Sequence, residues 1–297
     1  MPSKEALPPS LAIKPNSRVG VSLQSSFLGF STHAGFLNSL LDSGIRPDKI
    51  SGASSGALVA AAYAAGLEQD QLRDFVLDRK LRNSFWEWLV LLRAPAVFGA
   101  YLGHGVVSGR RAVRHLRDTL PITHIEDSPN AVLSIGVTNL TRRRGQLITQ
   151  GEVAPYVIAS CAVTPMICAQ EIDGELFLDG GFTDAAPFEH WIGDPGIDTI
   201  IIHNIAFDLP APNHWSKRAN FLCYWAAVHQ MVECQLTASR IARAEAAGKS
   251  VIVHETHTAR PRFFGPHEQF EDNYETAYNA WQKAPKLVAG KSHPALP

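Results

Sequence analysis

The sequence lacks a long apolar run, a strong charge bias and a recognisable leader. No segment approaches the roughly 18–20 consecutive apolar residues of a membrane-spanning helix, and the longest candidate, Phe85–Leu92, contains Glu87. Residues 1–17 hold prolines and charges rather than the apolar core of a signal peptide. The formal net charge of −1 gives no electrostatic case for binding nucleic acid or for long-range steering toward an anionic surface. We therefore expect a soluble, cytoplasmic protein whose contact with a membrane, if any, is peripheral.

Cysteine is also scarce. The four cysteines, Cys161, Cys168, Cys223 and Cys234, form no Cys-x-x-Cys pair and have no histidine at the spacing of a zinc site. We expect buried free thiols, which fits a reducing compartment. The rest of the composition is ordinary for a globular enzyme, because 45 % of the residues are apolar and 19 % are charged.

The most informative stretch is Ile50–Leu58, which contains a Gly-x-Ser-x-Gly motif at Gly52, Ser54 and Gly56. Such a motif also occurs by chance in a chain with 22 glycines. Here, however, an apolar residue leads into it, and an alanine-rich helix former that ends at Gly66 follows it. A serine on a tight turn between a strand and a helix is typical of a nucleophile, because the helix N-terminus adds N–H groups beside its hydroxyl.

Hydrophobic periodicity predicts alternating strands and helices. The chain opens as strand, helix, strand, elbow and helix, which is a parallel pair with a right-handed crossover. The predicted strands cover 18–23, 130–140, 146–149, 199–202 and 250–253, residues 172–178 are predicted as a hairpin with an Asp-Gly turn, and the predicted helices cover 33–43, 68–80, 107–120, 156–161, 220–247 and 273–282. Without a repeat or a linker, we expect an extended arm over 1–17, one domain over 18–285 and a loose tail over 286–297.

Two segments have two interpretations each. The aromatic stretch Phe85–Leu92 is either a lid or patch that rests on a lipid surface, or a buried helix over the core, which we favour. The run Arg142, Arg143 and Arg144 could bind a phosphate group, but its place between two predicted strands favours a solvated hairpin turn.

A serine nucleophile needs a base that accepts its proton. One arrangement uses a histidine held by an acid, but the hydrolase fold that carries it places several strands before the elbow. Ser54 follows only one strand and one helix, although several histidines lie downstream: His190, His203, His229, His254 and His257. The other arrangement, which we favour, uses a carboxylate directly. Asp179 is suitable because it ends an apolar strand and precedes Gly180 and Gly181.

Taken alone, Asp179 with Gly180 is explained equally well as a hairpin turn like the Asp-Gly pair at 173–174. Taken with the elbow, it resembles the patatin-like lipid acyl hydrolases. Members of that family carry Gly-x-Ser-x-Gly early in the chain and Asp-Gly-Gly or Asp-Gly-Ala well downstream. The resemblance covers about residues 18–205, including Ala159–Pro165 before the aspartate and the later pair Asp184 and Pro187.

This resemblance implies a three-layer α/β/α fold with a mostly parallel central sheet. It also implies a catalytic dyad of Ser54 and Asp179 that needs no metal or cofactor. Asp179 would deprotonate Ser54, which attacks an ester carbonyl of a phospholipid or another acyl lipid, and water would then hydrolyse the acyl-serine. Two alternatives remain open: an acyltransferase on the same dyad, or a catalytically weak lipid-binding or regulatory protein.

The second alternative is based on one departure from the family pattern. The family usually has a glycine-rich loop after its first strand, often Gly-Gly-Gly-x-Arg, whose N–H groups form the oxyanion hole. Counting back from His33 and Gly35, which match the family's helix, this loop corresponds to Gln24–Leu28, and it has no glycine and no arginine. Loss of one oxyanion donor costs roughly 3–4 kcal/mol. The candidate site residues around the oxyanion are Ser25, Ser26, Phe27, Gly52, Ser55 and Gly56.

Overall fold

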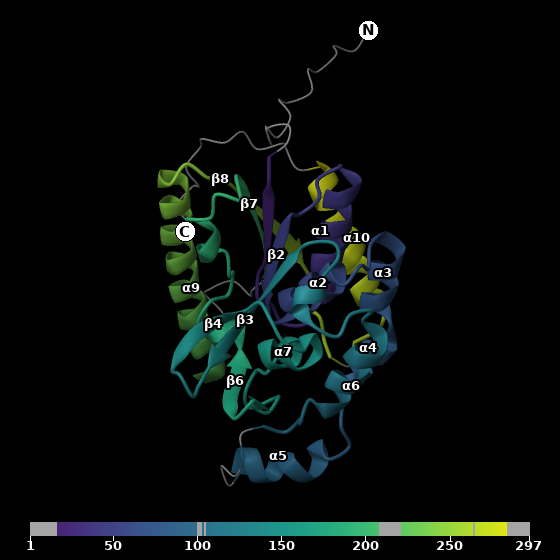
Figure 1. Cartoon of the computed structure of the whole chain (residues 1–297). Helices are drawn as coiled ribbons and strands as arrows, with labels where there is room; N and C mark the ends of the chain where they lie inside the picture. The colour runs from purple at the N-terminus through teal and green to yellow at the C-terminus, as the bar shows by residue number, and fades with distance from the viewer. Residues whose placement is uncertain (1–16, 100–102, 104, 208–220, 264, 284–297) are drawn as a thin grey trace.

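An eight-stranded sheet is the centre of the computed structural model, which describes residues 17–99, 103, 105–207, 221–263 and 265–283 (Figure 1). The strands are β1 (Val19–Leu23), β2 (Lys49–Ala53), β3 (Val132–Asn139), β4 (Arg144–Ile148), β5 (Gln170–Ile172), β6 (Glu175–Asp179), β7 (Thr199–Phe207) and β8 (Ser250–Thr258). Their order is β5-β6-β3-β2-β1-β7-β8, and β4 also pairs with β3. Strands β3, β2, β1, β7 and β8 are parallel, whereas β4, β5 and β6 pair antiparallel. The predicted, mostly parallel sheet is confirmed.

Helices cover both faces of the sheet, so the fold has three layers (Figure 1). One face packs against α1 (Phe30–Asp42), α2 (Ser55–Ala64), α7 (Val153–Ser160) and α10 (Glu268–Lys283), which share the larger apolar core with the sheet. The other face packs against α9 (Phe221–Ala246) and residues 186–192 in a smaller core. Most of the predicted arm over 1–17 and the whole predicted tail over 286–297 lie outside the described residues.

Successive residues of β1 point to opposite faces of the sheet, so this strand borders both apolar cores. Val19, Val21 and Leu23 are buried in the larger core. Gly20 points to the other face, where a Cβ atom would come within 2.8 Å of the Trp191 ring. A side chain at residue 20 would therefore displace the largest buried side chain of the smaller core.

The predicted helix over 68–80 is wrong in one respect, because it is two helices, α3 (Gln69–Leu77) and α4 (Arg79–Ser84). Asp78 separates them with an extended backbone, and its carboxylate accepts the N–H of Lys80 as an N-cap. The predicted helix over 107–120 begins later, as α6 (Arg110–Thr119), because the residue before it, Gly109, takes a left-handed φ of 80°.

The favoured interpretation of Phe85–Leu92 as a buried helix is also wrong. The helix of this region is α5 (Val90–Gly99), and it lies at the lower end of the molecule in Figure 1. Trp88, Leu91 and Leu92 are 69 %, 74 % and 65 % exposed. No helix in the described part of the chain is long and apolar enough to cross a membrane.

Two smaller predictions have mixed outcomes. Arg142 lies in the turn between β3 and β4, is half exposed and pairs with Glu175 at 2.6 Å. This agrees with the favoured interpretation as a solvated hairpin turn. Of the cysteines, Cys161 is a buried free thiol, but Cys168 and Cys234 are half-buried free thiols, so the prediction of burial is wrong for these two. The side chain of Cys223 lies outside the described residues.

Candidate active site

Ser54 and Asp179 meet because β2 and β6 share one edge of β3. Ile135 pairs with β2 and with β4, whereas Val137 pairs with β6 and with β4. Since a strand residue has one partner on each side, β2 and β6 must occupy the same edge, β2 as far as Gly136 and β6 from Val137. The two strands run toward each other. Ser54 directly follows β2 and Asp179 ends β6, so both residues lie at the junction.

Ser54 has the backbone of a nucleophile elbow. Its φ of 54° and ψ of −124° are strained for a residue with a side chain, and α2 begins at the next residue. A Cβ atom on Gly52 would lie 2.4 Å from the backbone of Gly56, and one on Gly56 would lie 2.2 Å from the carbonyl oxygen of Leu23. Both glycines of the motif are therefore required by close backbone approach.

Ser160 holds the elbow in place, although sequence reasoning did not single it out. Its hydroxyl accepts the N–H of Ser54 at 2.8 Å and donates to the carbonyl of Gly136 at 2.6 Å. The side chain is fully buried, so these two bonds fix the elbow to β3. The signal available in the sequence was the segment Ala159–Pro165, where Ser160 is one small residue among several.

The Asp179 carboxyl is almost completely buried, at 2 % exposure. Its Oδ1 accepts the N–H of Gly181 at 2.7 Å and the hydroxyl of Ser25 at 3.4 Å. Its Oδ2 has no partner of good hydrogen-bond geometry in the described residues, so this oxygen is available to accept a proton. Gly180 is required here too, because a Cβ atom would lie 2.2 Å from the carbonyl oxygen of Gly136.

Burial raises the pKa of Asp179 to about 6, against hydrogen bonds from Ser54, Gly181 and Ser25 that lower it. A carboxyl with a pKa near neutrality can accept a proton and return it during one reaction cycle. Burial, together with the charge of Asp179, raises the pKa of the Cys161 thiol, which also contacts the Ser54 hydroxyl. Cys161 is therefore a neutral neighbour of the dyad.

None of the histidines considered as a base is a hydrogen-bond partner of Ser54 or Asp179 in the described residues. Burial lowers the pKa of His190 and of His254 to about 4, and it lowers the pKa of His203 well below its ordinary value. His257 is exposed and pairs with Glu255, and the side chain of His229 lies outside the described residues.

The loop between β1 and α1 lies against the elbow. The N–H of Ser25 donates to the carbonyl of Ala185 at 2.7 Å, which removes this amide from the candidate oxyanion donors. The hydroxyl of Ser26 bonds to the hydroxyl of Ser55 at 2.9 Å and so ties the loop to the first residue of α2. Within the described ranges, the N–H groups of Ser26, Phe27 and Ser55 have no hydrogen-bond acceptor, so they remain the candidate donors.

Two buried, neutral histidines, His33 and His203, hold this loop in place through hydrogen bonds. The Nε2 of His33 lies 2.8 Å from the carbonyl of Gln24 and must carry the proton, because a carbonyl only accepts. Burial lowers the pKa of His33 to about 3, so its Nδ1 is bare and accepts from Nδ1–H of His203 at 2.8 Å. The Nε2 of His203 then accepts the hydroxyl of Thr256 at 2.9 Å. The glycine-free loop is thus anchored through two imidazoles to β8.

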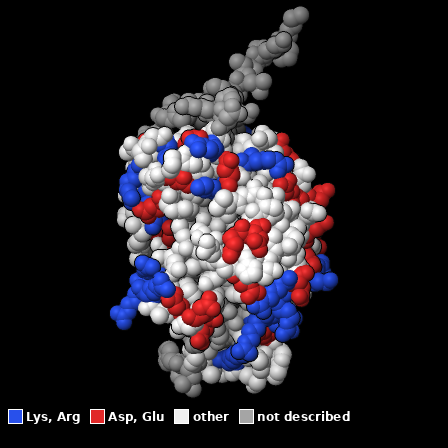
Figure 2. Space-filling view, viewed as in Figure 1, with Lys and Arg blue, Asp and Glu red and all other residues white. Residues whose placement is uncertain are grey.

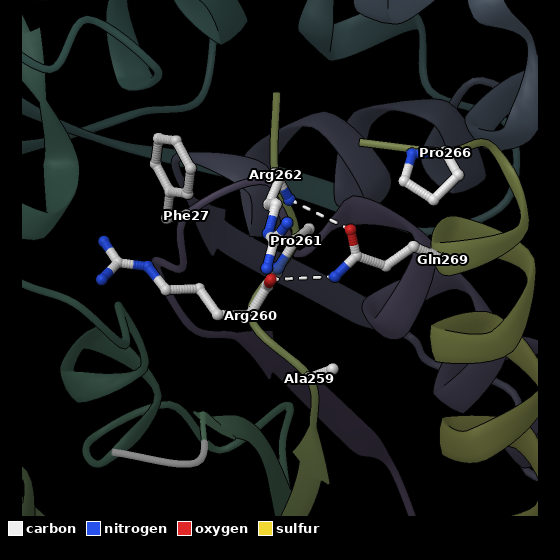
Figure 3. Close-up of a pocket in the computed structure, with 7 residues that line it drawn as sticks. All are labelled: Phe27, Ala259, Arg260, Pro261, Arg262, Pro266 and Gln269. Carbon is white, nitrogen blue, oxygen red and sulfur yellow. Dashed lines mark hydrogen bonds between the residues drawn. The ribbon is translucent and has the colours of Figure 1, made fainter. Parts of the chain in front are cut away.

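A pocket of about 670 Å³ opens beside Phe27, between the loop after β1 and the residues after β8 (Figure 3). The Arg260 guanidinium lies 5.6 Å from the centre of the Phe27 ring. Gln269 accepts the N–H of Arg262 and donates to the carbonyl of Arg260, which shapes the wall. Neither arginine has a carboxylate partner within the described ranges. The pocket therefore combines an aromatic ring with two available positive charges.

The family of this chain follows from comparison with known proteins. The model of the patatin-like phospholipase family matches residues 22–192, which is more than half of the chain, so the chain belongs to that family. The match runs from β1 past Asp179 and includes the elbow. The resemblance inferred from the motifs is confirmed.

Individual relatives are distant. The chain is 26 % identical to an NTE family protein of Mycobacterium tuberculosis over 182 residues, which are 61 % of this chain and 48 % of the relative. It is 26 % identical to lysophospholipase NTE1 of Pyricularia oryzae over 202 residues, which are 67 % of this chain and 13 % of the relative. The chain thus spans about half the length of the first relative and about an eighth of the second. VipD from Legionella pneumophila has a similar fold, with a TM-score of 0.51 at 14 % identity over 95 % of this chain and 71 % of VipD.

Proposed function

We propose that this chain is a serine lipid acyl hydrolase with Ser54 as nucleophile and Asp179 as base. The observation that carries the proposal is the junction on β3, where a strained serine and a buried carboxyl with a raised pKa face each other. Family membership supports an ester of a lipid as substrate, since the family is that of patatin-like phospholipases and one relative is named a lysophospholipase.

The reaction proceeds in two halves. The Asp179 carboxylate takes the Ser54 proton as the serine oxygen attacks the acyl carbonyl, and the collapsing tetrahedral intermediate expels the alcohol, which receives the proton from Asp179. Asp179 then takes a proton from water, which attacks the acyl-serine. Collapse of the second intermediate releases the fatty acid and returns the proton to Ser54.

The oxyanion that forms in both halves needs N–H donors. The N–H of Ser55 supplies one, at the positive end of α2, and the N–H groups of Ser26 and Phe27 supply the others. The pocket beside Phe27 would receive the polar end of the lipid, because Arg260 and Arg262 can pair with a phosphate group there.

Labelling with a fluorophosphonate probe, followed by peptide mapping, tests the nucleophile directly. We expect one adduct, on Ser54, because the probe mimics the tetrahedral intermediate and needs both an activated serine and an oxyanion site. The variant Ser54→Ala should take up no probe, should lose ester hydrolysis by at least about a thousandfold, and should keep its melting temperature.

The other outcomes are equally informative. An adduct at a different residue, or full activity in Ser54→Ala, would remove Ser54 from this role. A folded wild-type protein that takes up no probe would favour the lipid-binding alternative. Product analysis with an added lysophospholipid separates hydrolysis, which yields free fatty acid, from acyl transfer, which yields a new diacyl lipid.

A further inference from the structure

The segment around α5 presents an apolar surface that nothing in the described structure covers. We call this surface the α5 patch and define it as Trp88, Leu91, Leu92 and Phe98, which are 56–74 % exposed. Four large apolar side chains this exposed within eleven residues are unusual for a soluble surface. The patch is held outward by Glu87, a buried carboxylate that bonds to Arg93 and to both the hydroxyl and the N–H of Ser108.

The surroundings of the α5 patch are strongly basic. Residues 79–117 contain eight arginine or lysine residues and one acidic residue, so their formal charge is +7, whereas the whole chain carries −1. Figure 2 shows basic side chains gathered at the lower right of the molecule, next to the end that carries α5. We define the basic flank as its exposed members without a carboxylate partner in the described ranges: Arg79, Lys80, Arg110, Arg111 and Arg114.

The flank includes a small pocket between α4 and α6. Its volume is about 380 Å³, and Lys80, Arg111 and Arg114 contribute to its lining together with one carboxylate, that of Asp118. The Arg111 guanidinium also donates to the carbonyl of Trp86 at 2.6 Å, so the flank is joined to the start of the apolar segment. Three basic side chains against one carboxylate leave the pocket positive overall, which suits the phosphate groups at the surface of a bilayer.

The α5 patch lies at the end of the molecule where the dyad lies. The strand-like segment after α5 pairs with the loop that precedes the catalytic aspartate, through Val106 N–H to Pro165 and Val107 N–H to Met166. That loop begins at Ala162, whose carbonyl accepts the N–H of Asp179 at 3.1 Å. On the other side, the rings of Trp86 and Phe263 lie 6.3 Å apart, and Phe263 is close in sequence to the arginines beside Phe27.

We propose that the α5 patch and the basic flank dock this protein on an anionic lipid bilayer, with the apolar side chains inserted at the level of the headgroups. The proposal deepens the proposed function, because docking would place the active-site end against the lipid. Both forces needed for stable peripheral binding are present: apolar insertion, in which tryptophan is favoured at the interface, and attraction between basic side chains and anionic headgroups.

The test measures co-sedimentation with vesicles of phosphatidylcholine that contain about 30 % phosphatidylserine, in a Ser54→Ala background so that turnover plays no part. The double variant Leu91→Glu and Leu92→Glu should weaken binding by at least about tenfold, because two side chains lose apolar burial. The double variant Arg110→Glu and Arg114→Glu should weaken it by at least about twentyfold, since each basic residue contributes roughly fivefold near an anionic surface.

Matched controls come from elsewhere on the surface. Val132→Glu changes an apolar side chain that is 57 % exposed at the start of β3, the opposite end of the sheet, and Lys283→Glu changes an exposed lysine at the end of α10, whose preceding residue bonds to Ser39 near the end of α1. Both should bind like the parent. Unchanged binding by either α5 or flank variants, or equal binding to vesicles of phosphatidylcholine alone, would overturn the proposal.

A second readout separates this proposal from the proposed function. With Ser54 restored, the Leu91→Glu and Leu92→Glu variant should hydrolyse a soluble short-chain ester at the parent rate but lose hydrolysis of vesicle lipid. Vesicle binding without hydrolysis of any ester would leave docking intact and overturn the hydrolase. Equal loss on the soluble ester would show that these positions act on the site itself and would overturn docking as their role.

Discussion

At the scale of single residues, the burial of the Asp179 carboxyl has opposite effects: it raises the pKa toward the value that suits the proposed base, and it lowers the stability of the fold when the carboxyl is ionised. A base must be ionised, and the pKa of Asp179 is raised to about 6 by burial, so kcat/KM for a soluble ester should fall about tenfold per unit as the pH drops below 6. A profile that stays level between pH 5 and pH 8 would contradict the assignment of Asp179 as base.

The same raised pKa makes a prediction about folding. The native state holds the Asp179 proton more tightly than the unfolded state does, so ionisation between about pH 4 and pH 6 lowers the free energy of unfolding. Asp179→Asn removes this cost and should raise the free energy of unfolding at pH 8 by about 1–3 kcal/mol, while it abolishes hydrolysis. Denaturant unfolding of both proteins at pH 4 and pH 8 measures the change in the free energy of unfolding. An equal change at both pH values would contradict the raised pKa of Asp179 as its cause.

His33 is a second residue with a separable role, as a positioning residue. His33→Leu keeps the volume but removes the bonds to Gln24 and His203, which should cost about 1–3 kcal/mol of stability. Because the loop then loses its anchor, kcat should fall about tenfold or more with little change in KM, measured well below the melting temperature. His257→Leu, in an exposed position, is the control and should change neither value. A normal kcat in His33→Leu would show that the loop does not depend on the imidazole.

At the scale of elements, the loop between β1 and α1, whose N–H groups are the proposed oxyanion donors, shows how a loop without the family's glycines can be held. Leu28 takes a φ of 52°, an angle that glycine adopts easily, and its side chain packs against the larger apolar core. The link from Ser26 to Ser55 joins this loop to α2. Ser26→Ala should therefore lower kcat about tenfold and stability by less than about 1 kcal/mol.

The control for this prediction is Ser31→Ala in α1, which removes a buried hydroxyl without a hydrogen-bond partner in the described residues. It should change neither kcat nor stability by a comparable amount. Equal loss of activity in both variants would indicate a general effect of removing hydroxyls near α1, and would contradict a specific role for Ser26.

The same elements show what the sequence could and could not predict. The turn at Ser54 was predictable from its motif, because Gly52 is required by contact with the nearby backbone of Gly56, whereas the contact of Gly56 with Leu23 became visible only in the fold. The link between His33 and His203 was not, because only the pairing of β1 with β7 brings positions 33 and 203 together. The exposure of Leu91 was mispredicted, because apolar periodicity indicates a face to be covered but not what covers it.

At the scale of the whole molecule, charge is divided unequally. A chain with a net charge of −1 holds a segment of +7, so the remaining residues are acidic overall. Such a division gives the molecule a preferred orientation near an anionic surface even where the net charge gives no attraction. It also explains why the overall composition, taken alone, argued against steering toward such a surface.

The junction of β2 and β6 on β3 determines when, during synthesis, Ser54 and Asp179 can first meet. During synthesis the serine at position 54 leaves the ribosome 125 residues before the aspartate at position 179. Until β6 has paired beyond Gly136, a nascent chain would carry the proposed nucleophile without the proposed base. The lipid hydrolysis proposed for this chain is therefore expected to begin only after synthesis has passed residue 179 and β6 has joined β3.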